Sequence, residues 1–230
     1  MKSFLLDFVS LFYPECCHAC STPLNKGEKI LCTYCHYKLP LTNFHKQASN
    51  QVSRLFWGRQ PIEAATACYT FQKGGAIQHL IFQFKYKGYP EIGIEIGRRY
   101  GIELRQAPLF RNLDLILPVP LHFRKQKIRG FNQSACFGEG LSQSLGIPQN
   151  KTCLQRIQPT ESQTRKSRFS RWKNVETVFT LSQPEEIAGK HILLVDDVVT
   201  TGATLEACAK LLLEVEGTKV SIVAIAASIS

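Results

Sequence analysis

The sequence of 230 residues contains no apolar run long enough to cross a lipid bilayer. Residues 3–13 are rich in apolar side chains, but Asp7 interrupts them and Lys2 is the single basic residue before them, which is not the pattern of a secretory signal peptide. We therefore expect an amphipathic helix there and a cytoplasmic protein. Acidic residues are also scarce: 18 Asp and Glu stand against 28 Lys and Arg, so the net charge is +10. An excess of positive charge favours anionic partners such as diphosphates or nucleic acids, although a basic surface alone is common.

Disulfide bonds are not expected in a cytosolic chain, so the nine cysteines are interpreted as metal ligands or free thiols. Four of them form two C-x-x-C pairs on either side of residues 21–31, and these are Cys17 and Cys20, then Cys32 and Cys35. Two such pairs are typical of a tetrahedral Zn2+ site, and free thiols are the alternative. Cys16, His18 and His36 lie beside the pairs but fit the spacing less well. Since no nucleophile or general base accompanies the cysteines, we predict a structural site whose metal stabilises a small segment.

The most informative stretch runs from His191 to Leu205 and reads H-I-L-L-V-D-D-V-V-T-T-G-A-T-L. Its apolar residues 192–195 predict a buried parallel strand, which the adjacent carboxylates of Asp196 and Asp197 close. The turn that follows consists of Thr200, Thr201, Gly202, Ala203 and Thr204. A helix with one apolar face is expected after this turn, as far as about residue 216.

The chemistry of this stretch suits a sugar phosphate. A helix N-terminus presents N–H groups and the positive end of a dipole to a phosphate, threonine hydroxyls add donors, and Gly202 lets the backbone approach the ligand. Two carboxylates would repel the phosphate itself, but they can accept hydrogen bonds from sugar hydroxyls or hold Mg2+ through its waters. The alternative is an ordinary strand-to-helix turn with a capping threonine and solvated acids.

The remaining periodicity predicts alternating strands and helices. Buried strands are expected at 65–71, 113–119, 175–181 and 218–227, and helices from 75, at 91–105 and at 133–145. Asn132 is a candidate N-cap of the last of these helices, and Gly146 is its expected end. In the segment before the first strand, Phe44, Phe56 and Trp57 are expected to anchor the chain on the main domain.

Basic residues gather in three places. The loop 122–133 follows the carboxyl end of a strand, where α/β sheets bind anions, and it contains Arg124, Lys125, Lys127 and Arg129 without an acid. Residues 156–173 are also basic, with Arg165, Lys166 and Arg168 near their centre, and predict a mobile lid or an ordinary surface loop. In F-K-Y-K-G, Lys85 and Lys87 either reach an anion or complement the dipole of the preceding helix.

Together these motifs resemble the ComF (competence protein F, GntX-like) family. The resemblance covers essentially the whole chain. The motifs that carry it are the two C-x-x-C pairs, F-K-Y-K-G, P-V-P-L-H with R-G-F-N-Q, Q-T-R-K-S-R, and L-V-D-D-V-V-T-T-G-A-T-L. It implies an α/β fold with a type I phosphoribosyltransferase-like parallel sheet flanked by helices and a small N-terminal zinc ribbon. The implied division is 1–40 for the N-terminal helix and zinc ribbon, 41–64 for a linker, and 65–230 for the phosphoribosyltransferase-like domain. Phe123 departs from the family, which usually has a proline there.

The resemblance also implies the ligand, 5-phosphoribosyl 1-diphosphate (PRPP) with Mg2+. In that family the acidic pair holds the ribose hydroxyls and the threonine-rich turn holds the 5'-phosphate, which implies these roles for Asp196, Asp197 and residues 200–204. The loop 122–133 would be the diphosphate loop, with Arg124, Lys125 and Arg129 as its contacts. Residues 163–168, which include Arg165, Lys166 and Arg168, would belong to the flexible loop.

The leading hypothesis is a PRPP-binding protein that acts in DNA uptake and natural transformation. If the protein is an enzyme, a nitrogen nucleophile displaces diphosphate from the anomeric carbon of PRPP. The alternative is a single-stranded nucleic-acid-binding module that keeps the fold without transferase activity, with Trp57, Tyr86, Phe131 and Trp172 as stacking candidates. A PRPP-sensing repressor is less favoured because no winged-helix segment is visible. DNA-uptake proteins as partners and a homodimer are left open.

Overall fold

The computed structural model describes residues 14–156 and 178–228 of the chain. Its centre is a four-stranded sheet in the order β1-β6-β5-β2, in which every neighbouring pair of strands is parallel. The strands are β1 (Ala64–Thr70), β2 (Leu115–Pro118), β5 (His191–Val199) and β6 (Lys219–Ala227). The strands expected at 65–71, 113–119 and 218–227 are therefore present, and the parallel α/β architecture is confirmed.

Further strands, β3 (Leu154–Arg156) and β4 (Phe179–Leu181), form a separate antiparallel pair. They flank residues 157–177, which lie outside the described part of the chain. The strand expected at 175–181 is thus confirmed over its last residues only. The amphipathic helix expected at residues 3–13 also lies outside the described residues.

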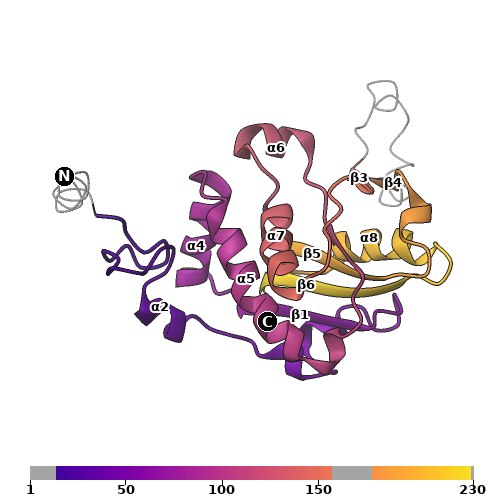
Figure 1. The fold of residues 1–230 in the computed structure, drawn as a ribbon, viewed down its shortest axis with the longest axis horizontal. Helices are drawn as coiled ribbons and strands as arrows, with labels where there is room; N and C mark the ends of the chain where they lie inside the picture. Colours follow the sequence, from indigo (N-terminus) through magenta and orange to yellow (C-terminus); the bar gives the residue numbers. More distant parts are fainter. Residues whose placement is uncertain (1–13, 157–177, 229–230) are drawn as a thin grey trace.

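Helices cover both faces of the central sheet (Figure 1). The described helices are α2 (Thr33–Lys38), α3 (Gln51–Arg54), α4 (Ala76–Tyr86), α5 (Glu91–Gln106), α6 (Phe123–Arg129), α7 (Gln133–Leu145) and α8 (Ala203–Leu213), with 3-10 turns η1 (Phe44–Lys46), η2 (Pro108–Phe110) and η5 (Pro184–Glu186). Helices α4, α5 and α7 share a buried cluster with Leu193 and Val195 of β5, whereas α8 shares another with Ile192 and Leu194. Successive side chains of a strand point to opposite faces, so one apolar run supplies both halves of the core.

Helices α5 and α7 pack closely because glycines face each other across their contact. A methyl group on Gly97 of α5 would clash with the carbonyl oxygen of Phe137, and one on Gly140 of α7 would clash with that of Ile94. As expected, Asn132 caps α7 by accepting a hydrogen bond from the Ser134 amide (3.0 Å). The close contact and the cap together fix the N-terminal end of α7 above the sheet.

The segment before β1 is held on the body by some of the expected anchors and not by others. Phe56 is buried and Phe44 is partly buried in the same cluster as α8. Trp57 was expected to be an anchor, but 60% of it is exposed, so that prediction is wrong. The short turn after α3 gives Phe56 and Trp57 different directions, and only Phe56 faces the core.

The basic segment 122–133 is not a loop throughout, as the sequence had suggested, because residues 123–129 form helix α6. His122 caps it by accepting a hydrogen bond from the Arg124 amide (3.3 Å), and Gly130, with φ of +79°, ends it. Arginine, lysine and glutamine are good helix formers, and their charge concealed this preference in the sequence.

Among the described residues, no helix combines the length and the apolar composition that crossing a membrane would require.

Candidate functional site

The two aspartates of the acidic motif lie where β5 extends past its neighbour β2. Pairing between β2 and β5 ends at Pro118 and Val195, while β5 continues beside β6 as far as Val199. Asp196 and Asp197 were expected to close the strand, but they are inside it. One edge of this last part of β5 is therefore free of β2, and the carboxylates meet side chains from the helices instead.

Asp196 is held by two hydrogen bonds to the same oxygen. Its Oδ1 accepts from Ser134 Oγ at the start of α7 (2.9 Å) and from the backbone N–H of Asp197 (2.8 Å). Burial, followed by the neighbouring Asp197 carboxylate, raises the pKa of Asp196 from 3.8 to about 7, against the opposing effect of the two hydrogen bonds and of Lys85. At neutral pH the pair of acids therefore shares fewer than two negative charges.

Asp197 is paired with a lysine from another helix. Lys85 Nζ, on the last turn of α4, lies 2.9 Å from Asp197 Oδ2, and the side chains of Lys85 and Asp197 are only 17% and 15% exposed. Both interpretations that the sequence left open for this lysine stand: it lies in the last turn of α4, and its ammonium reaches an anionic group, which is the carboxylate of Asp197. Lys87, the C-cap of α4, is exposed.

The threonine-rich turn forms a small hollow beside Asp196 and Asp197, which we call the acidic doublet. The hollow has a volume of about 40 Å³ and is lined by Asp196 and residues 198–205. Thr200, Thr201 and Thr204 are exposed around it, and Gly202 is the N-cap of α8 with φ of +77°, a conformation that favours glycine. A Cβ atom on Gly202 would lie 3.3 Å from the Phe56 ring, so the buried Phe56 supports the turn from below.

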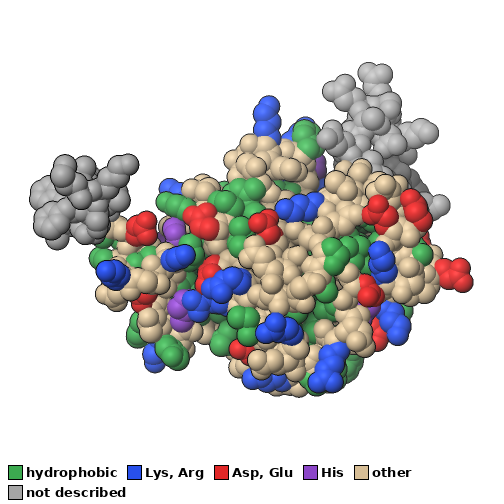
Figure 2. Space-filling model, viewed as in Figure 1, with side chains coloured by type: hydrophobic (Ala, Val, Ile, Leu, Met, Phe, Trp, Pro, Cys, Tyr) green, Lys and Arg blue, Asp and Glu red, His purple; other side chains and the backbone are tan. Residues whose placement is uncertain are grey.

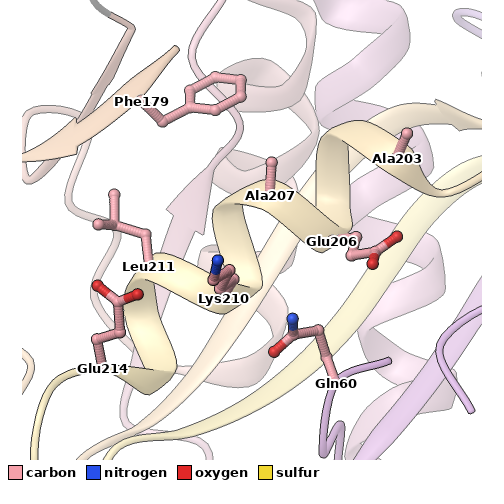
Figure 3. A pocket seen from close by; sticks show the side chains of 8 residues that line it. All are labelled: Gln60, Phe179, Ala203, Glu206, Ala207, Lys210, Leu211 and Glu214. Atoms are coloured by element: carbon pink, nitrogen blue, oxygen red, sulfur yellow. The ribbon is translucent and has the colours of Figure 1, made fainter. Parts of the chain in front are cut away.

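A larger hollow, of about 470 Å³, lies along the outer face of α8. In Figure 3, Phe179 of β4 lies across from Ala207 and Leu211 of α8, and Gln60 approaches the same helix from the segment after α3. This hollow does not include the aspartates. We place the candidate site at the smaller hollow because the carboxylate of Asp196, the threonine hydroxyls and the helix N-terminus line it, and Asp197 is the next residue along β5.

The basic residues expected at the site are divided between two positions. Arg129 lies beside α4, since its guanidinium is 5.3 Å from the centre of the Tyr86 ring and donates to Gln133 Oε1 (2.8 Å). Arg124 and Lys125 are exposed on α6, and Figure 2 shows Lys and Arg side chains projecting from the top of the molecule, where α6 lies. The expected flexible-loop residues Arg165, Lys166 and Arg168 lie outside the described residues.

The sequence did not reveal Ser134 as a site residue. It follows directly after R-G-F-N-Q, and a single serine at the start of a helix is ordinarily a cap or a surface residue. The available signal was position alone: α7 begins after a strand whose carboxyl end meets the acidic motif. Lys85 was recognised as a basic residue of interest, but its partner could not be read from the sequence.

The doublet offers the ligand atoms that Mg2+ prefers, which are hard oxygens. The contacts described above use Oδ1 of Asp196 and Oδ2 of Asp197, which leaves the second oxygen of each carboxylate for a ligand. The residues present therefore fit a magnesium ion held largely through its own waters.

The four predicted metal ligands come together at the N-terminal end of the described chain. The Sγ atoms of Cys17, Cys20, Cys32 and Cys35 all lie within 4.8 Å of one another, and those of Cys20 and Cys32 are 3.7 Å apart. In a tetrahedral site with Zn–S bonds of about 2.3 Å, sulfur atoms are about 3.8 Å apart, so the cluster fits zinc.

Backbone amides support two of these sulfur atoms. Cys17 Sγ accepts a hydrogen bond from the Cys32 amide (3.3 Å), and Cys32 Sγ accepts one from the Cys35 amide at the start of α2 (3.4 Å). Hydrogen bonding to Thr22 lowers the pKa of the Cys20 thiol to about 6, whereas burial raises the pKa of the Cys35 thiol. A bound cation would allow the buried thiols to lose their protons, which couples metal binding to folding.

The comparisons with known proteins agree with the family resemblance that the sequence motifs indicated. The phosphoribosyl transferase domain family matches residues 131–230, which include Ser134, the doublet and the turn but not Lys85 or the cysteines. DNA utilization protein YhgH of Shigella flexneri is 32% identical over 201 residues, which cover 86% of this chain and 83% of the relative. Competence protein F of Haemophilus influenzae is 34% identical over 137 residues, covering 58% of this chain and 60% of the relative. Competence protein ComFC of Bacillus subtilis is 34% identical over 138 residues, covering 60% and 54%.

The metal centre can be tested with two serine substitutions. We expect Cys17→Ser to lose most of its bound zinc and to unfold at a lower temperature, because three thiolates hold the ion poorly and the metal contributes folding free energy. Cys16→Ser is the matched control, since Cys16 is adjacent but outside the cluster. Zinc content of the purified proteins by mass spectrometry is the measurement, and full zinc occupancy in Cys17→Ser would contradict the assignment.

The raised pKa of Asp196 predicts a specific pH dependence of stability. The folded protein keeps a proton on Asp196 up to about pH 7, whereas the unfolded chain releases it near 3.8, so the free energy of unfolding falls as the pH rises between these values. Asp196→Asn has no such proton to release. Between about pH 5 and about pH 8 we therefore expect its free energy of unfolding to rise by a few kcal/mol relative to that of the wild type. Urea unfolding of both zinc-loaded proteins at several pH values measures the difference. Parallel plots of the free energy of unfolding against pH would contradict the prediction.

Proposed function

Because this chain belongs to the ComF family, whose members include proteins named for competence and DNA utilization, we propose that it binds PRPP together with Mg2+ and acts in the uptake or use of DNA. The role in DNA metabolism is taken from the names of the relatives. The chemistry of the site suggests a sugar phosphate, and the family resemblance narrows it to PRPP.

The observation that carries the ligand assignment is the convergence of unlike groups on one small hollow. The carboxylate of Asp196, which would repel a phosphate, lies next to a threonine-rich helix N-terminus that attracts one, and Asp197 follows Asp196 in β5. A single ligand satisfies both only if it carries hydroxyl groups at one position and a phosphate at another. Ribose 5-phosphate has this arrangement, with its hydroxyls donating to Asp196 and Asp197 and its phosphate accepting from Thr200, Thr201 and Thr204.

The 1-diphosphate would then extend toward α4 and α6. Arg129 lies on this side, next to Tyr86, and Arg124 and Lys125 are carried by the same short helix. The family resemblance offers Arg165, Lys166 and Arg168 as further contacts of the diphosphate. Magnesium would neutralise part of the diphosphate charge.

If the bound PRPP reacts, the anomeric carbon forms a bond to a nitrogen nucleophile as its bond to the diphosphate oxygen breaks, and the diphosphate leaves with the bonding electrons. The chain supplies no covalent nucleophile in this scheme. Its contribution is to hold the ribose in place and to stabilise the leaving group with cationic side chains.

Calorimetric titration with PRPP and Mg2+ tests the ligand assignment. We expect saturable binding to the wild type and at least a tenfold weaker association for Asp197→Asn, about the effect of losing one good charge-assisted hydrogen bond. Glu216→Gln is the control, because Glu216 is an exposed acid after α8. Absence of binding to the wild type, or equal constants for wild type and Asp197→Asn, would refute the proposal.

A second candidate function is binding of single-stranded nucleic acid, and the surface of α6 favours it. This helix exposes Arg124, Lys125 and Lys127 together with the apolar side chains of Phe123 (43% exposed) and Ile128 (79% exposed). Cations that contact phosphates and apolar groups that contact bases are the two elements of such binding.

The salt dependence of binding to a labelled oligonucleotide tests this second function. Replacing Lys125 and Lys127 by Ala should reduce the slope of log affinity against log salt by about 1.4, the value for two lost phosphate contacts on a single strand. The control replaces Lys190 and Lys219, which lie at the opposite end of the sheet where β5 and β6 begin. An unchanged slope would exclude α6 as the binding surface.

A further inference from the structure

The ion pair between Lys85 and Asp197 takes up one of the carboxylate oxygens that the proposed ligand would contact, and its ammonium repels an approaching cation. Lys85 Nζ lies 2.9 Å from Asp197 Oδ2, and both side chains are more than four-fifths buried. At this distance the ammonium donates directly to the carboxylate. A sugar hydroxyl or a hydrated cation that approaches the same oxygen therefore competes with Lys85.

The pair is also part of the charge balance of the doublet. Asp196 and Asp197 are adjacent in β5, and the contacts to them among the described residues come from Ser134 Oγ, the Asp197 amide and Lys85. Of these three groups only Lys85 carries a full positive charge. A divalent cation that arrived with a ligand would supply the same compensation, so the doublet does not need Lys85 once such a ligand is bound.

A second place for the ammonium lies close by. Tyr86 is the next residue along α4, and the Arg129 guanidinium lies over its ring, 5.3 Å from the ring centre. The end of α4 and the end of α6 are thus in contact, and Arg129 also donates to Gln133, the residue before Ser134, which contacts Asp196. An anionic group drawn to Arg129 would be within the range of the long, flexible Lys85 side chain.

We propose that Lys85 is a resident cation that blocks the acidic doublet in the ligand-free protein and moves to the anionic group of the ligand when a metal-complexed sugar phosphate displaces it. This inference rests on the proposed function for its second half, the transfer to the ligand. The consequence is that the site selects a metal–diphosphate complex over a free divalent cation. A free cation must displace Lys85 from Asp197 without offering the ammonium a new partner. A metal–diphosphate complex offers it an anionic group in place of the lost carboxylate.

The test compares binding of Mn2+ alone with binding of PRPP and Mg2+, using the zinc-loaded full chain. We expect Lys85→Met to bind Mn2+ about tenfold more tightly than the wild type, and PRPP with Mg2+ about tenfold more weakly. Paramagnetic resonance of free Mn2+ and calorimetry of PRPP are the two measurements. Lys87→Met is the matched control, since Lys87 is an exposed lysine two residues away, and it should behave as the wild type in both.

Two further variants locate the effect. Lys85→Arg keeps the positive charge and should keep Mn2+ binding weak, and the double variant Lys85→Met with Asp197→Asn should lose the gain because the metal has lost a carboxylate. Unchanged Mn2+ affinity in Lys85→Met would refute the block. Tighter Mn2+ binding with unchanged PRPP affinity would refute the transfer. If the wild type binds no PRPP, the proposed function fails, and the Mn2+ comparison still decides whether Lys85 blocks the doublet.

Discussion

Two adjacent carboxylates can remain largely buried near the end of β5 only because other groups compensate their charge. Desolvation and mutual repulsion both oppose ionisation of the pair, and together they raise the pKa of Asp196. Ser134 and a backbone amide offset part of this cost on one carboxylate, and Lys85 offsets part of it on the other. Each compensating side chain comes from a different helix, so the site requires α4, α7 and β5 to be placed correctly at the same time.

The placement of these elements follows from ordinary packing constraints. The close contact of Gly97 with α7 and of Gly140 with α5 sets how near these helices approach. The register of β5 against β2 ends at Val195, which leaves the next residues to project past the shorter strand. Buried Phe56 supports Gly202 from the other face, so the turn and the doublet are held from opposite sides of the sheet.

How much of this could be read from the sequence depended on whether the signal was local. The strands of the central sheet, α7 with its Asn132 cap, the four cysteines and the acid-to-threonine motif all have local signatures of periodicity, capping or spacing, and all were predicted, whereas the short strand β3 was not. Helix α6 was missed because its dense positive charge was given more weight than its helix propensity. The contacts that Ser134 and Lys85 make with the acids were not predicted, since these residues lie 62 and 112 positions from the acids (196 − 134 and 197 − 85) and no local pattern encodes such distances. Trp57 was misplaced for a related reason: apolar composition does not say which of two neighbouring aromatics faces inward.

The metal module and the acidic doublet are connected through α4. The ring of His18, beside the ligand Cys17, lies 4.4 Å from the ring of Tyr89, which follows the glycine at the end of α4. Cys17, Cys32 and Cys35 share one buried cluster with the apolar face of that helix. The cysteine module therefore packs against the helix that carries Lys85, and if the cysteines hold a metal ion, its loss would loosen one support of the Lys85–Asp197 pair. The cysteine cluster thus has a physical route by which to influence the site, because it helps to fix the end of the helix that carries Lys85.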